Sequence, residues 1–284
     1  MASLLALLAA VFYGAADFLG GITTRRATMI GAVLVTQGAG LAVLLLVTPL
    51  LPDAHLTRTD VIFGALGGIT GSVGVGLLYL ALAIGPMSVV APVTAVCAAI
   101  VPLGVGLMLG ERPDPWAALG VLLALIAVAL LSQTETAGDE RHAAPSRLGQ
   151  GIRVALASGV AVGLFFVAVA QTTADAVMWP LAISRVVSLT MFLALAVATG
   201  RPAGVPRAAV APALACGALD MLANALYLVA VRQGQLGLVA TLASLYPAST
   251  VLLARIVLGE RLGAWQQLGV AGAVGAIVLI VGNS

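Results

Sequence analysis

The chain carries very little charge. Lysine is absent from its 284 residues, and Asp, Glu and Arg together make up 8% of them, whereas soluble domains contain about 25% charged residues. A soluble fold of this length could not cover its surface with so few charged side chains, and a net charge of +2 is too small to indicate nucleic acid as a partner. With only two cysteines and two histidines, the sequence predicts no disulfide framework, no metal site and no cofactor.

The sequence is instead strongly apolar, because 61% of its residues are hydrophobic. A transmembrane helix needs about 20 mostly apolar residues, and ten runs of this kind can be marked. We therefore predict an all-α, polytopic membrane protein with ten transmembrane helices. The runs lie at 3–22, 29–51, 60–84, 86–109, 114–132, 150–174, 177–199, 207–232, 234–257 and 263–282.

One long polar stretch, 133–149, divides these runs into two groups of five. We therefore expect a first five-helix repeat at 1–132, a polar linker at 133–149 and a second five-helix repeat at 150–284. Each of the three tryptophans opens a predicted helix, at a position where an amphipathic ring prefers the membrane interface. They are Trp116, Trp179 and Trp265.

The two halves repeat each other in sequence. YLALAIG at 79–85 corresponds to YLVAVRQG at 227–234, and LMLGER at 107–112 corresponds to IVLGER at 256–261. A constant offset of 149 holds after Gly85, and before it Asp220 aligns with Ser72. Five helices per half is an odd number, so the second half must insert upside down. Inverted repeats are the usual architecture of alternating-access carriers.

The duplicated LGER pattern, the ten helices and the segment YGAADFLGG at 13–21 resemble the drug/metabolite transporter superfamily, specifically its ten-helix EamA-type branch. The resemblance implies a two-repeat, exporter-like carrier of small metabolites. It also implies that helices 1–4 and 6–9 line a central cavity, with helices 5 and 10 outside it.

Polar residues within the apolar runs mark the candidate site, because they are costly in a membrane and usually face a cavity or a partner. Tyr13 and Asp17 lie one turn apart on the first helix, and Asp220 and Asn224 repeat that spacing on the eighth. The hydroxyl of Ser244 has the alternative of bonding to the preceding helical turn. The expected substrate or cavity residues are Tyr13, Asp17, Gln37, Tyr79, Arg185, Ser188, Asp220, Asn224, Tyr227 and Ser244.

Four charged residues are candidates for charges within the membrane: Asp17, Arg185, Asp220 and Arg255. They form two structural ion pairs, or include a carboxylate that binds protons or substrate, or extend from helix ends into the interface. Their positions along the helices predict Asp220 at the level of Arg185, and Asp17 at the level of Arg255. We expect Asp220 to be paired and Asp17, which lies nearer the surface, to be the coupling residue.

Glu111 and Glu260 each follow a glycine that ends one helix, and each precedes the next helix. A carboxylate in this position meets the positive end of the following helix dipole. Both are therefore predicted to be structural caps.

These features predict a secondary transporter of exporter type, and not an enzyme, that moves a small metabolite, an amino acid or an amphipathic drug-like compound by alternating access. The alternative is a membrane channel or a sensor without a transport cycle. The expected partners are a small-molecule substrate and the lipid bilayer of the inner, cytoplasmic membrane, without nucleic acid. Eight arginines on the linker side against three on the side of the termini favour a cytoplasmic linker, whereas the family resemblance favours cytoplasmic termini.

Overall fold

The computed structural model of the protein describes residues 1–84, 87–131, 145–200, 204–259 and 263–282, and the regular structure within them is helical. Two short 3-10 helices, η1 (Thr48–Leu50) and η3 (Ala174–Ala176), lie in connections between helices. The α-helices are α1 (Ala2–Thr24), α2 (Met29–Val47), α3 (Arg58–Ile84), α4 (Met87–Met108), α5 (Pro115–Leu131), α6 (Pro145–Ala170), α7 (Trp179–Thr199), α8 (Arg207–Val231), α9 (Leu236–Ala243), α10 (Tyr246–Leu258) and α11 (Ala264–Val281).

The helices have the length and composition of membrane spans. Within the described residues, eight segments are long and apolar enough to cross a membrane, and Val93–Met108 and Pro115–Leu131 are shorter apolar helices. Because α9 and α10 form one segment, Leu236–Val257, the ten predicted helices are confirmed. Many large apolar side chains remain exposed on the outer faces, among them Leu4 and Leu8, as expected where the surrounding medium is lipid.

The span formed by α9 and α10 is broken near its middle, whereas the sequence predicts one run over 234–257 in which Pro247 permits a bend. Ser244 and Leu245 form a turn between the two helices, and Pro247 lies in the first turn of α10. Proline has no backbone N–H to donate to the preceding turn, so the helix restarts there. The buried hydroxyl of Ser244 donates to the carbonyl oxygen of Ala240 at 2.7 Å, which satisfies one carbonyl beside the break.

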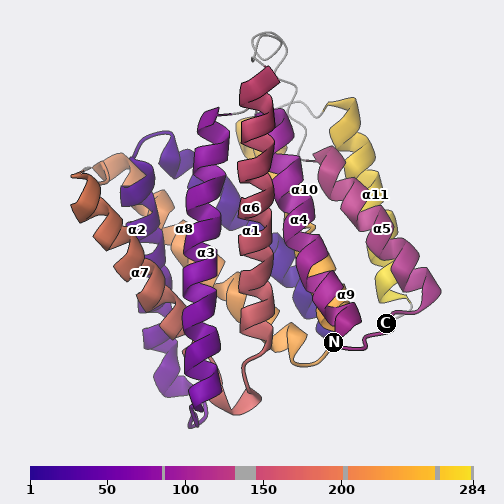
Figure 1. Ribbon diagram of the computed structural model, residues 1–284, viewed down its shortest axis with the longest axis horizontal. Helices are drawn as coiled ribbons and strands as arrows, with labels where there is room; N and C mark the ends of the chain where they lie inside the picture. Colours follow the sequence, from indigo (N-terminus) through magenta and orange to yellow (C-terminus); the bar gives the residue numbers. More distant parts are fainter. Residues whose placement is uncertain (85–86, 132–144, 201–203, 260–262, 283–284) are drawn as a thin grey trace.

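Both termini lie at the same end of the bundle (Figure 1), as an even number of crossings requires. We call this the termini end and the opposite end the linker end. α6 begins at Pro145, inside the stretch 133–149 that was expected to be linker, while residues 132–144 lie outside the described part. Trp116 and Trp265 are exposed in the first turns of α5 and α11.

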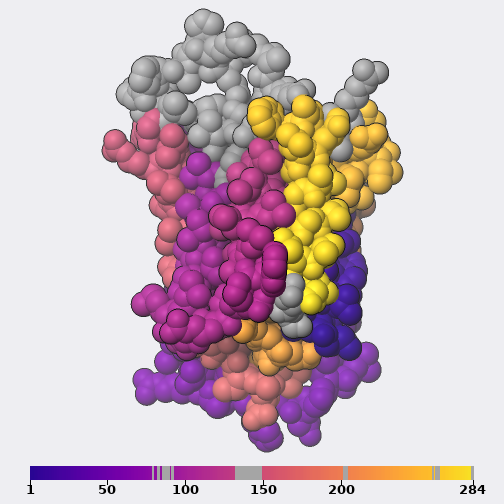
Figure 2. Space-filling view, turned by 90° about the vertical axis from the view of Figure 1, so that its right-hand side faces the viewer, coloured from indigo at the N-terminus to yellow at the C-terminus, as the bar shows by residue number. Residues whose placement is uncertain are grey.

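The two halves pack with a two-fold pattern. α1 packs along α8 as α6 packs along α3, and α2 packs against α8 as α7 packs against α3. α4 packs against α6 as α9 and α10 pack against α1. The outer pair consists of α5 and its own counterpart α11, which lie side by side on one face of the molecule (Figure 2). Exchanging each helix for its counterpart thus preserves the most extensive contacts of the bundle, as an inverted repeat requires.

Two glycines show how the repeats correspond. A Cβ atom at Gly68 would collide with the carbonyl oxygen of Ser184, and one at Gly217 would collide with the carbonyl oxygen of Thr36. Each glycine therefore allows close helix approach at equivalent places. Because Gly68 corresponds to Gly217, the counterpart of Asp220 is Gly71, and the sequence alignment of Asp220 with Ser72 was wrong by one residue.

Glu111 joins the two repeats at the termini end. Its carboxylate accepts hydrogen bonds from the backbone N–H groups of Leu236 and Gly237, the latter at 2.9 Å, at the beginning of α9. Glu111 is thus a helix cap, but the expected helix was wrong: it caps α9 of the second repeat rather than the following helix, α5. A Cβ atom at Gly106 would collide with this carboxylate. Glu260 lies outside the described residues.

Removal of this cross-repeat cap should destabilise the fold. We expect Glu111→Ala to cost about 1–2 kcal/mol, because two N–H groups at the positive end of α9 lose a charged acceptor. Gly106→Ala should act in the same direction by displacing the carboxylate. Unfolding curves in detergent micelles would measure both effects. The control is Asp114→Ala, because Asp114 caps only the neighbouring α5 through the N–H of Trp116. An equal loss in the control would contradict a cross-repeat role.

Candidate functional site

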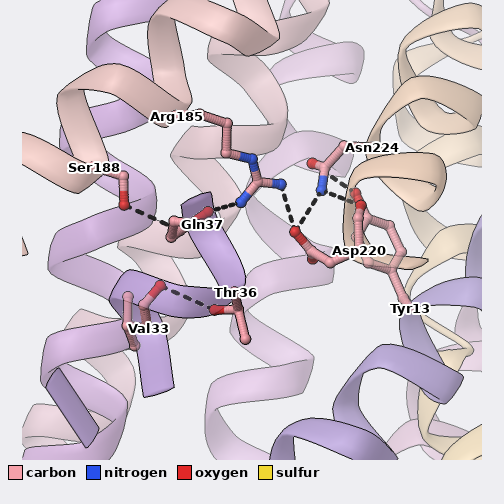
Figure 3. Close-up of polar contacts among 8 residues, drawn as sticks. All are labelled: Tyr13, Val33, Thr36, Gln37, Arg185, Ser188, Asp220 and Asn224. Carbon is pink, nitrogen blue, oxygen red and sulfur yellow. Dashed lines mark hydrogen bonds and ion pairs between the residues drawn. The ribbon is translucent and has the colours of Figure 1, made fainter. Parts of the chain in front are cut away.

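The interior of the bundle contains a connected chain of polar side chains centred on Arg185 (Figure 3). The guanidinium of Arg185 on α7 forms an ion pair with Asp220 on α8 and donates to the side-chain oxygen of Gln37 on α2. Gln37 in turn donates from Nε2 to the hydroxyl of Ser188, at 3.0 Å. The chain therefore joins one helix of the first repeat to two helices of the second.

The chain continues from Asp220 to α1. The side-chain amide of Asn224 donates to the backbone oxygen of Asp220 at 2.7 Å and to its carboxylate at 3.3 Å. The hydroxyl of Tyr13 donates to the amide oxygen of Asn224 at 3.0 Å. Asn224 thus uses both ends of its amide to connect Tyr13 of the first repeat with the ion pair.

The pair of Arg185 and Asp220 has very different exposure on its two sides. Arg185 keeps 10% of its side-chain surface exposed and Asp220 keeps 32%. A buried guanidinium needs a counter-charge and several acceptors, and Asp220 and Gln37 supply them. The pairing expected from helix depth is therefore confirmed, while Asp220 retains a carboxylate surface that a solute can reach.

The site lies on the two-fold axis of the fold. Because Gly68 approaches Ser184 as Gly217 approaches Thr36, Ser184 corresponds to Thr36 and Arg185 corresponds to Gln37. Arg185 and Gln37 bond to each other. Two residues that are related by an axis and touch each other must lie on either side of it. The polar chain is therefore at the interface of the repeats, where inverted-repeat carriers bind their substrates.

Asp17 faces the interior of the bundle although its side chain is exposed. It lies seven residues after Ala10 and eleven after Ala6, so it shares their helix face, and both alanines are buried. The exposed Leu4 and Leu8 occupy the opposite face of α1. Asp17 therefore meets space between helices rather than lipid. Within the described residues its carboxylate accepts no hydrogen bond and has no ion-pair partner.

The sequence predicts Asp17 at the level of Arg255, and within the described residues these two side chains form no ion pair. Arg255 is exposed near the end of α10, beside the exposed Ile256 and Val257. A long side chain in that position extends toward the membrane surface. Position along a helix fixes the depth of a side chain but not the direction in which it points, so equal depth does not by itself bring Asp17 and Arg255 together.

Aromatic rings close the site toward the termini end. Tyr227 is fully buried, and its ring packs on Phe166 with a centroid distance of 4.7 Å. Its hydroxyl donates to the carbonyl oxygen of Phe166 at 3.3 Å. Phe166 also contacts the ring of Tyr13 edge-on, at 6.1 Å. Tyr227 thus belongs to an aromatic plug rather than to the polar chain. Polar residues within the apolar runs could not indicate Phe166, because its side chain is apolar.

Two other expected site residues are not part of the polar chain. The hydroxyl of Ser244 is engaged by its own helix, as the alternative interpretation held. Tyr79 lies in α3, but its side chain is outside the described part of the structure. The structure therefore joins Tyr13, Gln37, Arg185, Ser188, Asp220 and Asn224 into one network, with Asp17 one turn from Tyr13 along α1.

Comparison with known proteins identifies the family. The model of the EamA-like transporter family matches residues 1–133 and 149–282. The chain belongs to the EamA-like transporter family. EamA-like proteins are multi-pass membrane transporters of small solutes, and not enzymes.

A solved structure, titled only "Crystal structure of protein", is similar to this chain in fold. It covers 98% of this chain and 95% of its own length with a TM-score of 0.78 and 17% sequence identity. This likeness supports the fold alone. No curated protein matches the sequence.

A double-mutant cycle should reveal the coupling between Arg185 and Asp220. Asp220→Asn is expected to cost about 1.5–3 kcal/mol of stability, because it leaves a guanidinium in the bundle without its counter-charge. The double variant Arg185→Gln/Asp220→Asn should cost less than the sum of its single variants. Unfolding in detergent micelles would measure the cycle, with the exposed loop carboxylate variant Asp175→Asn as control. Additive costs would contradict the coupling.

Proposed function

We propose that this protein is a secondary transporter that moves a small solute by alternating access, with the polar chain around Arg185 as its binding centre. The observation that carries the proposal is the network joining Tyr13 and Gln37 of one repeat to Arg185, Asp220 and Asn224 of the other. A movement of α1, α2, α7 and α8 relative to one another would remodel these bonds, so a solute bound among them would be coupled to that motion.

The surroundings of the site support access of a solute from one end of the bundle only. Asp17 lies nearer the linker end than Tyr13 and is exposed between helices. Toward the termini end, Phe166 and Tyr227 are buried and packed together. We infer that this conformation admits the solute from the linker end and is closed at the termini end. Export from the cytoplasm follows if the linker end faces the cytoplasm, as the arginine distribution favours.

The charges suggest what drives the cycle. Asp220 is neutralised by Arg185, whereas Asp17 has no ion-pair partner among the described residues. A carboxylate that is reached by water and lacks a fixed counter-charge is suited to exchange protons. We therefore assign the coupling role to Asp17. The substrate class remains a small metabolite, an amino acid or an amphipathic compound.

The remaining expectations follow the same proposal. The two five-helix repeats are assigned to 1–132 and 150–284, with the linker at 133–149, in the inner membrane of the cell. A channel or a sensor is the competing function. A channel would pass solute without saturation or counterflow, and a sensor would show no substrate-dependent flux.

Proteoliposomes loaded with a panel of small metabolites test the function. We expect saturable uptake of at least one compound, and counterflow when the same compound is present on both sides. Flux without saturation would support a channel, and no flux with any compound would contradict transport of these solute classes.

Asp17→Asn should separate coupling from binding. The variant is expected to retain counterflow but to lose acceleration by an imposed pH gradient, because asparagine cannot carry a proton across. Asp175→Asn, which changes an exposed loop carboxylate, should behave like the parent. Normal gradient-driven uptake by a well-folded Asp17→Asn variant would remove Asp17 from the coupling mechanism.

A further inference from the structure

A second network that joins the repeats lies at the termini end. Its Arg232 follows Asn224 of the polar chain by eight residues, which is about two helical turns. Asp60, in the first turn of α3, is fully buried. Its carboxylate accepts from the backbone N–H of Thr173 at 2.7 Å and from the Thr173 hydroxyl at 3.0 Å. It also accepts from the N–H and hydroxyl of Thr57, at 2.9 and 2.6 Å. One buried carboxylate thus fixes the start of α3 to the α6–α7 connection of the other repeat.

Arg232 holds the same connection from the other side. It directly follows α8, and its guanidinium donates to the carbonyl oxygens of Thr173 and Val177, the latter at 2.8 Å. A third bond reaches the hydroxyl of Thr172 at 3.3 Å. Burial lowers the pKa of Arg232 from its ordinary value, and the nearby charge of Asp60 opposes that shift. The Nε atom is buried and has no partner within the described residues, so the network is incompletely satisfied.

The backbone that Arg232 holds is strained. Val177 has a φ of +48° and a ψ of −113°, and within the described residues it is the one non-glycine position with positive φ. A β-branched residue is disfavoured in this conformation. Strain of this kind persists where surrounding contacts enforce it, often at elements that switch between two states. Here the hydrogen bond from Arg232 to the Val177 carbonyl is the enforcing contact.

At the linker end, the positions that correspond to Asp60 and Arg232 carry no charge. The repeat register places Ala209 at the position of Asp60, and Ala83 at the position of Arg232. Alanine side chains can neither accept nor donate a hydrogen bond, so these two positions cannot repeat the bonds that Asp60 and Arg232 form at the termini end.

We propose that Asp60, Thr173 and Arg232 form a latch that closes the termini end of the transporter, and that opening of this end breaks their bonds and releases the strained backbone at Val177. The inference rests on the proposed alternating-access function. It assigns to the latch the bias toward the conformation seen here, in which the termini end is closed.

Cysteine accessibility can test the latch without any substrate. In a background with Cys97 and Cys216 replaced by alanine, Ala182→Cys reports the termini end, because Ala182 is buried in α7 and lines a small pocket together with Val177. Gly21→Cys reports the linker end, because a Cβ atom there meets open space. Both reporters are labelled with a water-soluble maleimide in lipid nanodiscs, where reagent reaches both faces.

We expect the parent to react rapidly at Gly21→Cys and slowly at Ala182→Cys. Asp60→Asn and, separately, Thr173→Val should speed labelling at Ala182→Cys and slow it at Gly21→Cys, on the order of tenfold for each charged hydrogen bond lost. Val177→Gly should have the opposite effect, because it removes the strain of the closed state. Asp175→Asn, in the same connection, serves as the matched control and should leave both rates unchanged.

Several results would overturn the latch. Unchanged rates in the latch variants would assign Asp60 and Thr173 to helix capping alone, and faster labelling of both reporters would mean general loosening rather than switching. If Asp60→Asn does not fold, Thr173→Val still decides, because it keeps the carboxylate and its cap on α3. Counterflow without exchanged accessibility would reject the latch but keep the transport function, whereas exchanged accessibility without counterflow would do the reverse.

Discussion

A guanidinium inside a helical bundle that crosses a membrane must be neutralised by other helices, because lipid offers neither counter-charge nor acceptor. Arg185 meets this requirement with Asp220 and Gln37, and so determines how α2, α7 and α8 approach one another. Asn224 and Tyr13 extend the same network to α1. The most costly residue of the interior thus also organises the interface between the repeats, and a solute that competes for these bonds acts on the relative position of both halves.

The fold could be predicted from the sequence to a large extent, because each apolar run must form a helix in lipid and an odd number of helices per repeat forces inversion. The depth of Arg185 and Asp220 along their helices also predicted their pairing. The direction in which each side chain points around its helix could not be predicted as well. It separates Asp17 from Arg255, and it places the carboxylate of Glu111 at α9 of the other repeat rather than at the next helix in sequence.

The other errors have local physical causes. The turn at Ser244 and Leu245 interrupts a segment that is long and apolar enough to be one membrane span, so hydrophobicity alone could not locate it. The alignment of Asp220 with Ser72 relied on matching tyrosines, whereas the close approach at Gly68 and Gly217 gives a register shifted by one residue. Contacts between backbones thus define the correspondence of the repeats better than matching side chains on their surfaces.

An inverted repeat in isolation favours neither end of the molecule, since each helix contact has its counterpart. Any preference for one open end must come from residues that break the symmetry. In this chain the unmatched charges are placed unequally along the axis. Asp17 is exposed toward the linker end, and Arg185 and Asp220 neutralise each other near the middle. At the termini end Asp60 joins the two repeats through Thr173, and Arg232 joins the end of α8 to the same α6–α7 connection. In the proposed alternating-access cycle, the repeated helices supply two conformations, and we infer that these asymmetric polar residues bias which of them is populated when no solute is bound.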